Sequence, residues 1–464
     1  MDPKPHAAPT PDAQARHARL AAADHRHLWH PFTQMQGWLE EDPIIVDSAE
    51  GMFLVDTLGR RYLDGVSSLW CNLHGHRVPE IDAAVRAQLD RIAHSTLLGL
   101  ASTASIECAE ELARHLPPKL TRIFYSDAGA TAVEIALKIA FQHHQLRGDR
   151  QRTEFVALRG GYHGDTVGAV SVGGVDLFHE LFGPLLFPVN RAPQPYCYRC
   201  PLGKAPETCG MACADEVEKV FLSKPGKIAA LVLEPVMQGA DGMIAQPPGY
   251  VRRMRELCDR HGALLVCDEV ATGFGRTGTT WAVEHEGVTP DILTTAKGLT
   301  GGYLPLAVTA TTEHVFESFL GPFESKRTFF HGPTYCGNPL ACAAATASMR
   351  LFRERVLPAL PRKVEVLREA LLPALALPNV GEVRQRGLMV GIELVKDRAT
   401  RAEYAYALRA GHRVCLAARE LGALLRPLGN VVVLMPPPAM DEAQLRELAA
   451  IAVEAIRRTT PGLG

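Results

Sequence analysis

The sequence lacks the features that would place a protein in a membrane or on a nucleic acid. No run reaches the roughly 18 consecutive apolar residues that cross a bilayer. The 49 basic and 51 acidic residues leave a formal net charge of −2, so no excess of one sign indicates a nucleic-acid or lipid-surface partner. Residues 1–6 lack the apolar core of a signal peptide, and internal repeats are absent. These absences predict a cytoplasmic protein that binds neither membrane nor nucleic acid.

Cysteine is present, but not in the pattern of a disulfide framework. Among the eleven cysteines, Cys108 and Cys267 lie inside expected helices or strands, which favours a reducing compartment. An insertion near residues 197–213 contains two close pairs, Cys197 with Cys200 and Cys209 with Cys213. Such pairs bind zinc or an iron–sulfur cluster in some proteins, yet the second pair is one residue longer than the usual CxxC spacing. A structural metal and free surface thiols both remain open, and no metal enters the predicted chemistry.

The most informative stretch runs from Leu264 to Pro305. An apolar segment ends abruptly at Asp268, a glycine-rich loop follows at 273–278, and Lys297 lies in an otherwise uncharged, glycine-rich segment. Ligands of open α/β sheets bind beyond the carboxyl ends of the strands, so Asp268 is expected at a ligand site. An acid followed about thirty residues later by such a lysine suits pyridoxal phosphate. The lysine binds the cofactor aldehyde covalently, and the aspartate keeps the pyridine nitrogen protonated. Either residue alone would be read as a surface ion pair.

Two glycine-containing turns upstream fit the same cofactor. Residues 123–131 turn from a strand into a helix, which directs free backbone N–H groups at an anion, although an ordinary helix cap is the plainer alternative. Residues 160–166 form a second loop after an apolar strand, and its Tyr162 offers a ring that stacks on a pyridine. A core tyrosine in a turn is the alternative there.

With these motifs in this order, the chain resembles the class III aminotransferases of the fold type I pyridoxal phosphate enzymes, from about Trp29 onward. The resemblance implies an α/β fold with a mostly parallel, seven-stranded type of sheet in a large domain. A small α/β domain would come from both chain ends, and two subunits would form a homodimer with active sites at their interface. We expect a flexible tail at 1–24, an arm and part of the small domain at 25–78, the large cofactor-binding domain at 79–345, and the C-terminal small domain at 346–464.

The resemblance also implies roles for individual residues. Lys297, Asp268 and Tyr162 would be catalytic, with His163 in support of the ring. The cofactor phosphate would lie at Gly129 and Ala130, where the family usually has a serine at the second position. A segment around Thr328–Tyr335 would cross to the neighbouring subunit's cofactor. The residues expected to bind cofactor are Gly129, Ala130, Tyr162, Asp268, Lys297, Pro333 and Thr334, and those expected to bind substrate are Leu69, Trp70, Tyr162, Lys297, Gly332 and Arg426.

Several segments are similar to the class III enzymes that convert 8-amino-7-oxononanoate into 7,8-diaminononanoate for biotin. Residues 29–35 resemble their amino-terminal signature, and the matching arginine, Arg426, would hold the far carboxylate of the ketone substrate. Phe32 and Leu69 replace a tyrosine and a tryptophan often found in users of S-adenosylmethionine, so that compound and lysine both remain open as amino donors. The alternatives are another class III aminotransferase, which acts on an ω-amino acid or diamine with pyruvate or 2-oxoglutarate, and a non-catalytic binding protein on the same fold.

Overall fold

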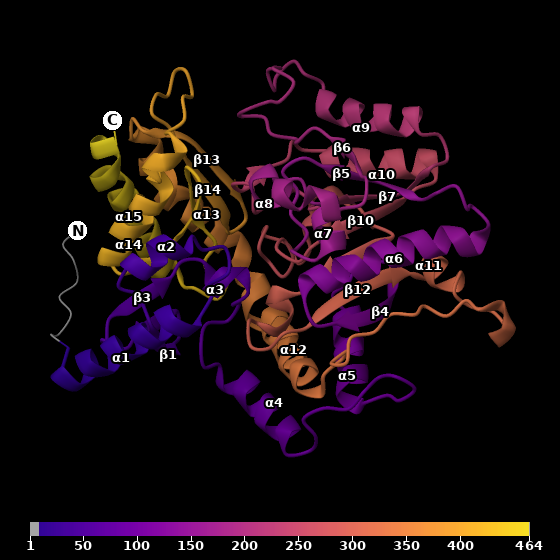
Figure 1. Cartoon of the computed structure of the whole chain (residues 1–464), viewed down its shortest axis with the longest axis horizontal. Coiled ribbons are helices and arrows are strands. Elements are labelled where there is room, and N and C mark those ends of the chain that lie inside the picture. Colours follow the sequence, from indigo (N-terminus) through magenta and orange to yellow (C-terminus); the bar gives the residue numbers. More distant parts are fainter. Residues whose placement is uncertain (1–8, 464) are drawn as a thin grey trace.

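A seven-stranded sheet organises the larger lobe of the computed structural model, which describes residues 9–463 (Figure 1). Strand β12 runs antiparallel to both of its neighbours, and the other strands of the sheet share one direction. The predicted α/β fold with a mostly parallel sheet is therefore confirmed. In spatial order the strands are β4 (Leu120–Ser126), β12 (Ala307–Thr312), β11 (Ile292–Thr295), β10 (Leu264–Asp268), β7 (Ile228–Leu233), β5 (Glu154–Leu158) and β6 (Asn190–Ala192).

Both faces of this sheet are buried, which explains why its central strands read as continuous apolar runs. Successive side chains of a strand point to opposite faces. In β7, Ala230 and Val232 join the cluster under helix α6 (Gly129–Arg147), whereas Leu231 and Leu233 join the cluster on the other side. That second face is covered by α10 (Tyr250–His261), with α9 (Ala212–Ser223) beside it.

The smaller lobe is built from both ends of the chain. One sheet has the order β1 (Val46–Glu50), β2 (Phe53–Asp56), β3 (Arg61–Asp64) and β15 (Ala423–Leu424), so an N-terminal hairpin pairs with a C-terminal strand. A second sheet has the order β13 (Val380–Arg386), β14 (Met389–Leu394), β17 (Val431–Leu434) and β16 (Arg426–Leu428). Helices α13 (Leu360–Leu371), α14 (Ala410–Glu420) and α15 (Glu442–Thr459) complete the lobe.

The remaining elements connect or flank these sheets. Helix α12 (Pro339–Leu351) lies between the two lobes and runs without a break through the boundary predicted at 345/346. Among residues 9–463, no helix is long and apolar enough to cross a membrane. The other elements are α2 (Met35–Glu40), α3 (Ser67–Trp70), α4 (Pro79–Leu89), α5 (Thr103–Ala113), α7 (Val167–Val172), α8 (Asp176–His179), α11 (Glu313–Glu317), β8 (Met237–Gln238) and β9 (Ile244–Ala245).

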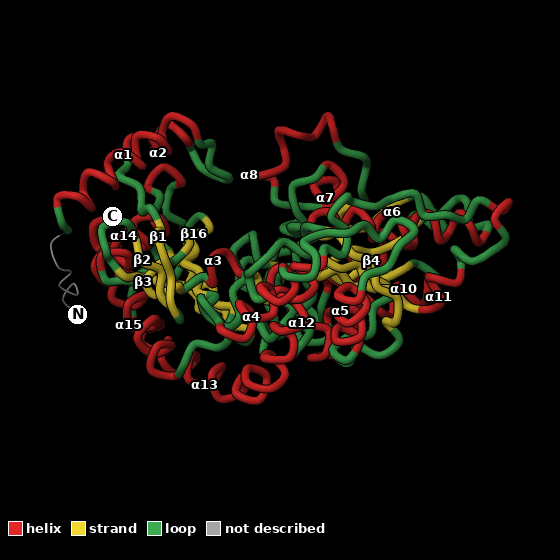
Figure 2. The backbone as a smooth tube through the Cα atoms, turned by 90° about the horizontal axis from the view of Figure 1, so that it is seen from below, coloured by secondary structure: helices red, strands yellow, loops and turns green. Residues whose placement is uncertain are grey.

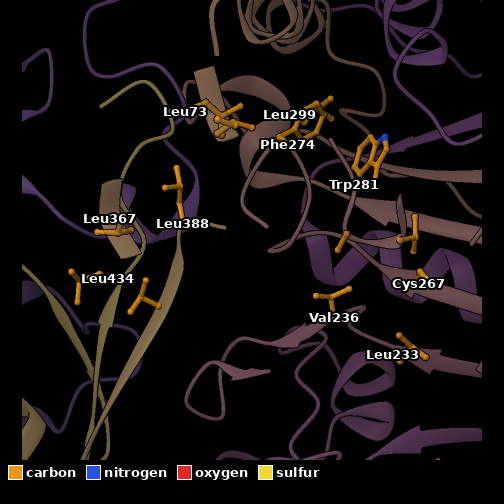
Figure 3. Packing of buried hydrophobic residues seen from close by; sticks show 14 of the residues in the cluster. Leu73, Leu233, Val236, Cys267, Phe274, Trp281, Leu299, Leu367, Leu388 and Leu434 are labelled. Carbon is orange, nitrogen blue, oxygen red and sulfur yellow. The ribbon is translucent and has the colours of Figure 1, made fainter. Parts of the chain in front are cut away.

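One hydrophobic cluster extends from the large sheet into the smaller lobe. Figure 3 shows part of it, with Leu233 of β7 and Cys267 of β10 at one end and Leu367 of α13 and Leu434 of β17 at the other. Phe274 and its neighbours, from the glycine-rich loop after β10, lie between these ends. The two lobes therefore share a core.

The flexible tail predicted at 1–24 is wrong over its described part, because α1 spans Pro11–His27. Thr10 caps the helix by accepting a hydrogen bond from Ala13 N, and proline occupies the first turn, where its missing N–H costs nothing. The buried His17 side chain contacts Thr57 and Asp42 at 2.7 and 2.9 Å. Figure 2 shows α1 and α2 along the edge of the smaller lobe, near β1 and β2. The helix is polar and docks through hydrogen bonds, so no apolar stripe in the sequence indicates it. Residues 1–8 of the predicted tail lie outside the described part.

The smaller lobe contacts the glycine-rich loop closely at Gly387. It has φ +60° in the turn between β13 and β14, and a Cβ there would lie 2.2 Å from the carbonyl carbon of Thr277. Gly429, between β16 and β17, has φ +57° with open space around the same position. We expect Gly429→Ala to cost about 1 kcal/mol from backbone strain. Gly387→Ala should cost about 4 kcal/mol, because backbone atoms must move as well. Denaturation midpoints measure both, and equal shifts would contradict the close contact.

Candidate active site

A cavity of about 720 Å³ opens at the carboxyl edge of the large sheet, within the size range of small-molecule sites. The segments that follow β4, β5, β7, β10 and β11 all contribute to its wall. Because these strands run in one direction, their carboxyl ends meet at one edge. Among the predicted residues, the cavity wall contains Leu69, Trp70, Gly129, Ala130, Tyr162, Asp268, Lys297 and Arg426.

Asp268 is the last residue of β10 and is held by three groups. Its Oδ1 accepts hydrogen bonds from Val270 N at 3.1 Å and Thr294 Oγ1 at 3.0 Å. Its Oδ2 lies 2.8 Å from His163 Nδ1. An oxygen with one partner can accept a second hydrogen bond, so Oδ2 can accept one from a ligand in the cavity. The carboxylate is therefore fixed in place, and its Oδ2 can still accept a hydrogen bond.

His163 supports this carboxylate from a fully buried position on the loop after β5. Burial lowers the pKa of its imidazole, but the hydrogen bond to Asp268 and the charge of that carboxylate together outweigh burial and raise the pKa above its ordinary value. Asp268 therefore stabilises the protonated form of His163.

Lys297 follows β11 and begins a short 3₁₀ turn, Lys297–Thr300. Its φ is +44°, a strained conformation for a residue with a side chain, and such strain gathers at functional sites. Its Nζ lies 5.0 Å from the ring centroid of Trp70. Burial lowers the pKa of the Lys297 amine, although Asp268 and Glu234 nearby oppose that change. The amine therefore gives up its proton more readily than an exposed lysine.

The start of α6 forms a hollow suited to an anion. Its N-cap residue, Ala128, has no side-chain oxygen to cap the helix, and Asp127–Ala130 line the cavity. The N–H groups of the first turn therefore face the cavity without a capping group. A Cβ on Gly129 would lie 2.7 Å from Val270 Cγ1, so only glycine leaves this approach open. The site fits a phosphate, with no hydroxyl at Ala130 to add to the backbone donors.

Two polar residues shape the cavity between the hollow and the outer wall. Glu234, after β7, is buried and accepts hydrogen bonds from Tyr162 N at 2.8 Å and Gly239 N at 2.7 Å. Burial raises the pKa of Glu234 to about 7. The hydroxyl of Tyr162 donates to Asp165 at 2.8 Å, which fixes its ring at the cavity wall.

The outer wall is mostly apolar, with one positive charge. Phe32 lies edge-on to Tyr162, with ring centroids 6.4 Å apart, and Leu69 and Leu428 continue the apolar surface. Arg426, the first residue of β16, is half-buried, and burial lowers its pKa. Over residues 9–463, no carboxylate lies within ion-pair distance of Arg426. A ligand with a carboxylate would supply the missing partner.

Three predicted residues do not line this cavity: Gly332, Pro333 and Thr334. They lie in an exposed segment that Lys138 contacts through Phe330 O and His331. The family resemblance places this segment at the partner subunit's site, and its contribution there stays a prediction.

Sequence reasoning missed several wall residues, among them Val270 and Phe178. The signal for Val270 was available, since it lies two residues beyond Asp268 on the same side of the chain. Phe178 gave no signal, because it lies in the four-residue helix α8, which only the fold brings to Phe32.

The four cysteines of the 197–213 insertion surround one small hollow away from this cavity. Within the described chain, no group of three or more His, Cys, Asp or Glu side chains is arranged to hold a metal ion. All eleven cysteines are free thiols.

The contact between His163 and Asp268 predicts a pH effect on stability. Because the folded pKa of His163 lies above its unfolded value of about 6.5, its stabilising contribution is complete below that pH. It is lost as the pH rises through the folded pKa. We expect the thermal midpoint of the cofactor-free protein, relative to that of His163→Gln, to fall as the pH rises from 6 to 9. Parallel profiles for the two proteins would exclude a charged His163.

Comparisons with known proteins place this site in a family. The model of the family described as aminotransferase class III matches residues 37–456. An adenosylmethionine-8-amino-7-oxononanoate aminotransferase of Nitratidesulfovibrio vulgaris is 57% identical over 441 residues, covering 94% of this chain and 81% of the relative. The crystal structure of the enzyme of that name from Methanocaldococcus jannaschii has a TM-score of 0.91 at 42% identity, covering 95% of this chain and 99% of the other. An (S)-enantioselective omega-transaminase from Thermomicrobium roseum has a TM-score of 0.89 at 34% identity, covering 96% and 98%. The chain belongs to aminotransferase class III.

Proposed function

We propose that this aminotransferase, whose cofactor is pyridoxal 5′-phosphate, transfers an amino group to 8-amino-7-oxononanoate and forms 7,8-diaminononanoate for biotin synthesis. The observation that carries the proposal is a largely apolar cavity with a reactive amine, Lys297, and a guanidinium, Arg426, that lacks a protein carboxylate. A long aliphatic ketone with a terminal carboxylate matches both features. The named relatives at 40–57% identity support the same substrate.

The cavity residues fit the cofactor. When bound, pyridoxal phosphate supplies an aldehyde for the amines and a ring that accepts electrons from the reacting carbon. Gly129 and Ala130 would hold the phosphate with their backbone N–H groups, since no side chain caps that helix. Asp268 would hold a proton at the ring nitrogen through Oδ2, and His163 fixes that carboxylate in place.

Lys297 is the base and acid of the proposed reaction. Burial lowers the pKa of this amine, so it loses its proton more readily than an exposed lysine and would take a proton from the donor carbon and return it. The Trp70 ring beside Nζ limits the positions of the amine and excludes water from that side.

Arg426 and Tyr162 would orient the ketone substrate. A guanidinium binds a carboxylate through two parallel N–H donors, which fixes direction as well as position. Both residues line the same cavity, and burial lowers the pKa of Arg426 while Tyr162 opposes that change. The carbonyl is thereby directed toward Lys297 while the chain lies along the apolar wall.

The amino donor is S-adenosylmethionine or lysine. Both carry an amino group beside a carboxylate, and Phe32 and Leu69 form the wall that either must pass. Leu69 is half exposed, and no tryptophan ring stands at its position. This wall is smaller than in enzymes that carry two tryptophans there.

We also propose a cytoplasmic homodimer. The segments near residues 93–98 and 328–338 lie together, since Asn338 contacts Ala93 O at 3.3 Å and His94 stacks near Tyr335 at 4.7 Å. Large apolar side chains project there, and Leu98 and Phe330 are 89% and 82% exposed. Burying them against a second copy would bring Gly332–Thr334 toward the partner's cofactor. Free thiols suit a reducing compartment.

Separate half-reactions test the function. Purified enzyme is mixed with S-adenosylmethionine or lysine, and the absorption band of the bound cofactor is followed. One donor should bleach the band, and 8-amino-7-oxononanoate should then restore it with formation of the diamine. Lys297→Ala should fold and bind cofactor but show no turnover, because it lacks the proton-transferring amine. Restoration by pyruvate or 2-oxoglutarate but not by the aminooxononanoate would favour an ω-amino acid aminotransferase. Turnover by Lys297→Ala would exclude the proposed base.

Replacing Arg426 should act on the ketone half-reaction. A charged hydrogen bond to a carboxylate contributes about 1.5–3 kcal/mol, so Arg426→Met should slow this half-reaction by about 100-fold in its second-order rate constant. Arg413, exposed on α14, gives the matched control Arg413→Met, with rates within about two-fold of wild type. Equal loss with ketones that have no carboxylate would contradict the assigned role.

A further inference from the structure

The backbone before the active-site tryptophan forms a left-handed turn. Ser67, Ser68, Leu69 and Trp70 have φ values of +51°, +48°, +74° and +69°. Residues with side chains avoid this region, and four in succession are rare because each brings Cβ close to the following carbonyl. Such a turn persists only where its surroundings hold it.

The buried side chains of Asp64 and Arg276 hold the turn. Asp64 accepts hydrogen bonds from the backbone N–H of Ser68 at 2.9 Å and from its hydroxyl at 2.7 Å. The hydroxyl of Ser67 donates to Met435 O and accepts a hydrogen bond from Arg276 Nη1 at 2.9 Å. The first residue of the turn is thus fixed from the glycine-rich loop after β10.

Arg276 belongs to that loop and is a buried cation that no described carboxylate contacts directly, although the charge of Asp64 acts on it from a greater distance. Only 1% of the residue is exposed, yet its hydrogen bonds go to neutral oxygens of Ser67, Asn72 and Pro436, at 2.8–2.9 Å. In the described part of the chain, no carboxylate lies within ion-pair distance, and Nε has no partner. Burial lowers its pKa to about 10, which still leaves it charged at neutral pH. Burying an unpaired charge is costly, so packing alone does not explain an arginine here.

The acceptors of Arg276 explain the choice of side chain. Ser67 starts the left-handed turn, Asn72 follows its end, and Pro436 lies after β17 in the smaller lobe. One planar group therefore joins both ends of the turn to a distant segment. The guanidinium presents several donors in a rigid fork, whereas a lysine ammonium presents a compact charge on a flexible stem.

The turn carries the residues nearest the reacting amine. Trp70 is 5% exposed and lies 5.0 Å from Lys297 Nζ, while Leu69 faces the cavity. Trp70 Nε1 is buried without a hydrogen-bond partner, so no hydrogen bond from the ring fixes its position. The ring is confined by contact, since a Cβ on Gly239 would lie 3.3 Å from it. Its placement depends on the backbone of the turn.

We propose that Arg276 is a positioning residue: its buried guanidinium holds the left-handed turn Ser67–Trp70 in the conformation that places Trp70 beside Lys297 and Leu69 in the substrate path. It touches neither substrate nor cofactor and acts through the turn. This role rests on Lys297 being the reacting amine, but not on which ketone or donor the enzyme uses.

The test follows Trp70 directly in the holoenzyme labelled with 5-fluorotryptophan. The chain has four tryptophans, and single Trp→Phe variants assign their ¹⁹F resonances. Arg276→Lys should shift or broaden the Trp70 resonance and leave those of Trp29 and Trp38 unchanged. Ser67→Ala should produce the same change to a smaller degree, because it removes one of the three acceptors. Arg384→Lys is the matched control, since Arg384 is also buried but pairs with Glu382 and Glu393. It should leave Trp70 unchanged.

Kinetics of the same variants separate positioning from stability. Arg276→Lys should lower kcat of the donor half-reaction by about 10- to 100-fold, because small misplacements near a reacting group have effects of this size. Arg384→Lys should stay within about three-fold of wild type. The proposal is overturned if the Trp70 resonance is unchanged in Arg276→Lys. It is also overturned if only Trp281, which packs on Gly273 of the same loop, responds. The Trp70 resonance reports the conformation of the turn even if the enzyme uses none of the ketone and donor pairs tested.

Discussion

The in-register parallel pairing of β10 between β7 and β11 is the constraint on which the active site depends. Val266 of β10 pairs with Val232 of β7 and with Ile292 of β11, so the three strands end close to one level. The residues at and just beyond these strand ends, Glu234, Asp268 and Lys297, therefore reach one cavity. A slip of one residue in β10 would turn Asp268 to the other face of the sheet, where helices leave no room for a ligand. The chemical properties of the site therefore depend on the register of these strands.

Charges buried at this edge are balanced within a small group of residues. Asp268 raises the pKa of His163 against the effect of burial, whereas Glu234 is held by backbone N–H groups and has its pKa raised to about 7 by burial. Arg276 adds a positive charge below the cavity and contributes to the lowered pKa of Lys297. Neighbours in the cavity wall thus shift the pKa values of His163, Glu234 and Lys297.

How much could be predicted from the sequence depended on how local each signal was. Asp268 ends an apolar strand and Lys297 follows another, so strand ends and glycine turns predicted the fold class and residues that line one cavity. Helix α1 was missed because it docks through His17 and Arg16 without an apolar stripe. The contacts of Arg276 were also beyond reach, since its acceptors lie up to 209 residues away. The positive φ values at Ser67–Trp70 depend on those contacts, and no glycine in this segment indicates them in the sequence.

The hydrophobic cluster shared by both lobes limits how the enzyme can move. Lobes joined by a thin polar interface rotate against each other about hinges, whereas a continuous apolar core resists such rotation, because opening it would expose Phe274 and its neighbours to water. Substrates therefore enter and leave a cavity whose walls on the two lobes are held together by this core. We expect an enzyme with such a core to keep the same catalytic geometry between turnovers and to move mainly in the segments at the edge of the cavity.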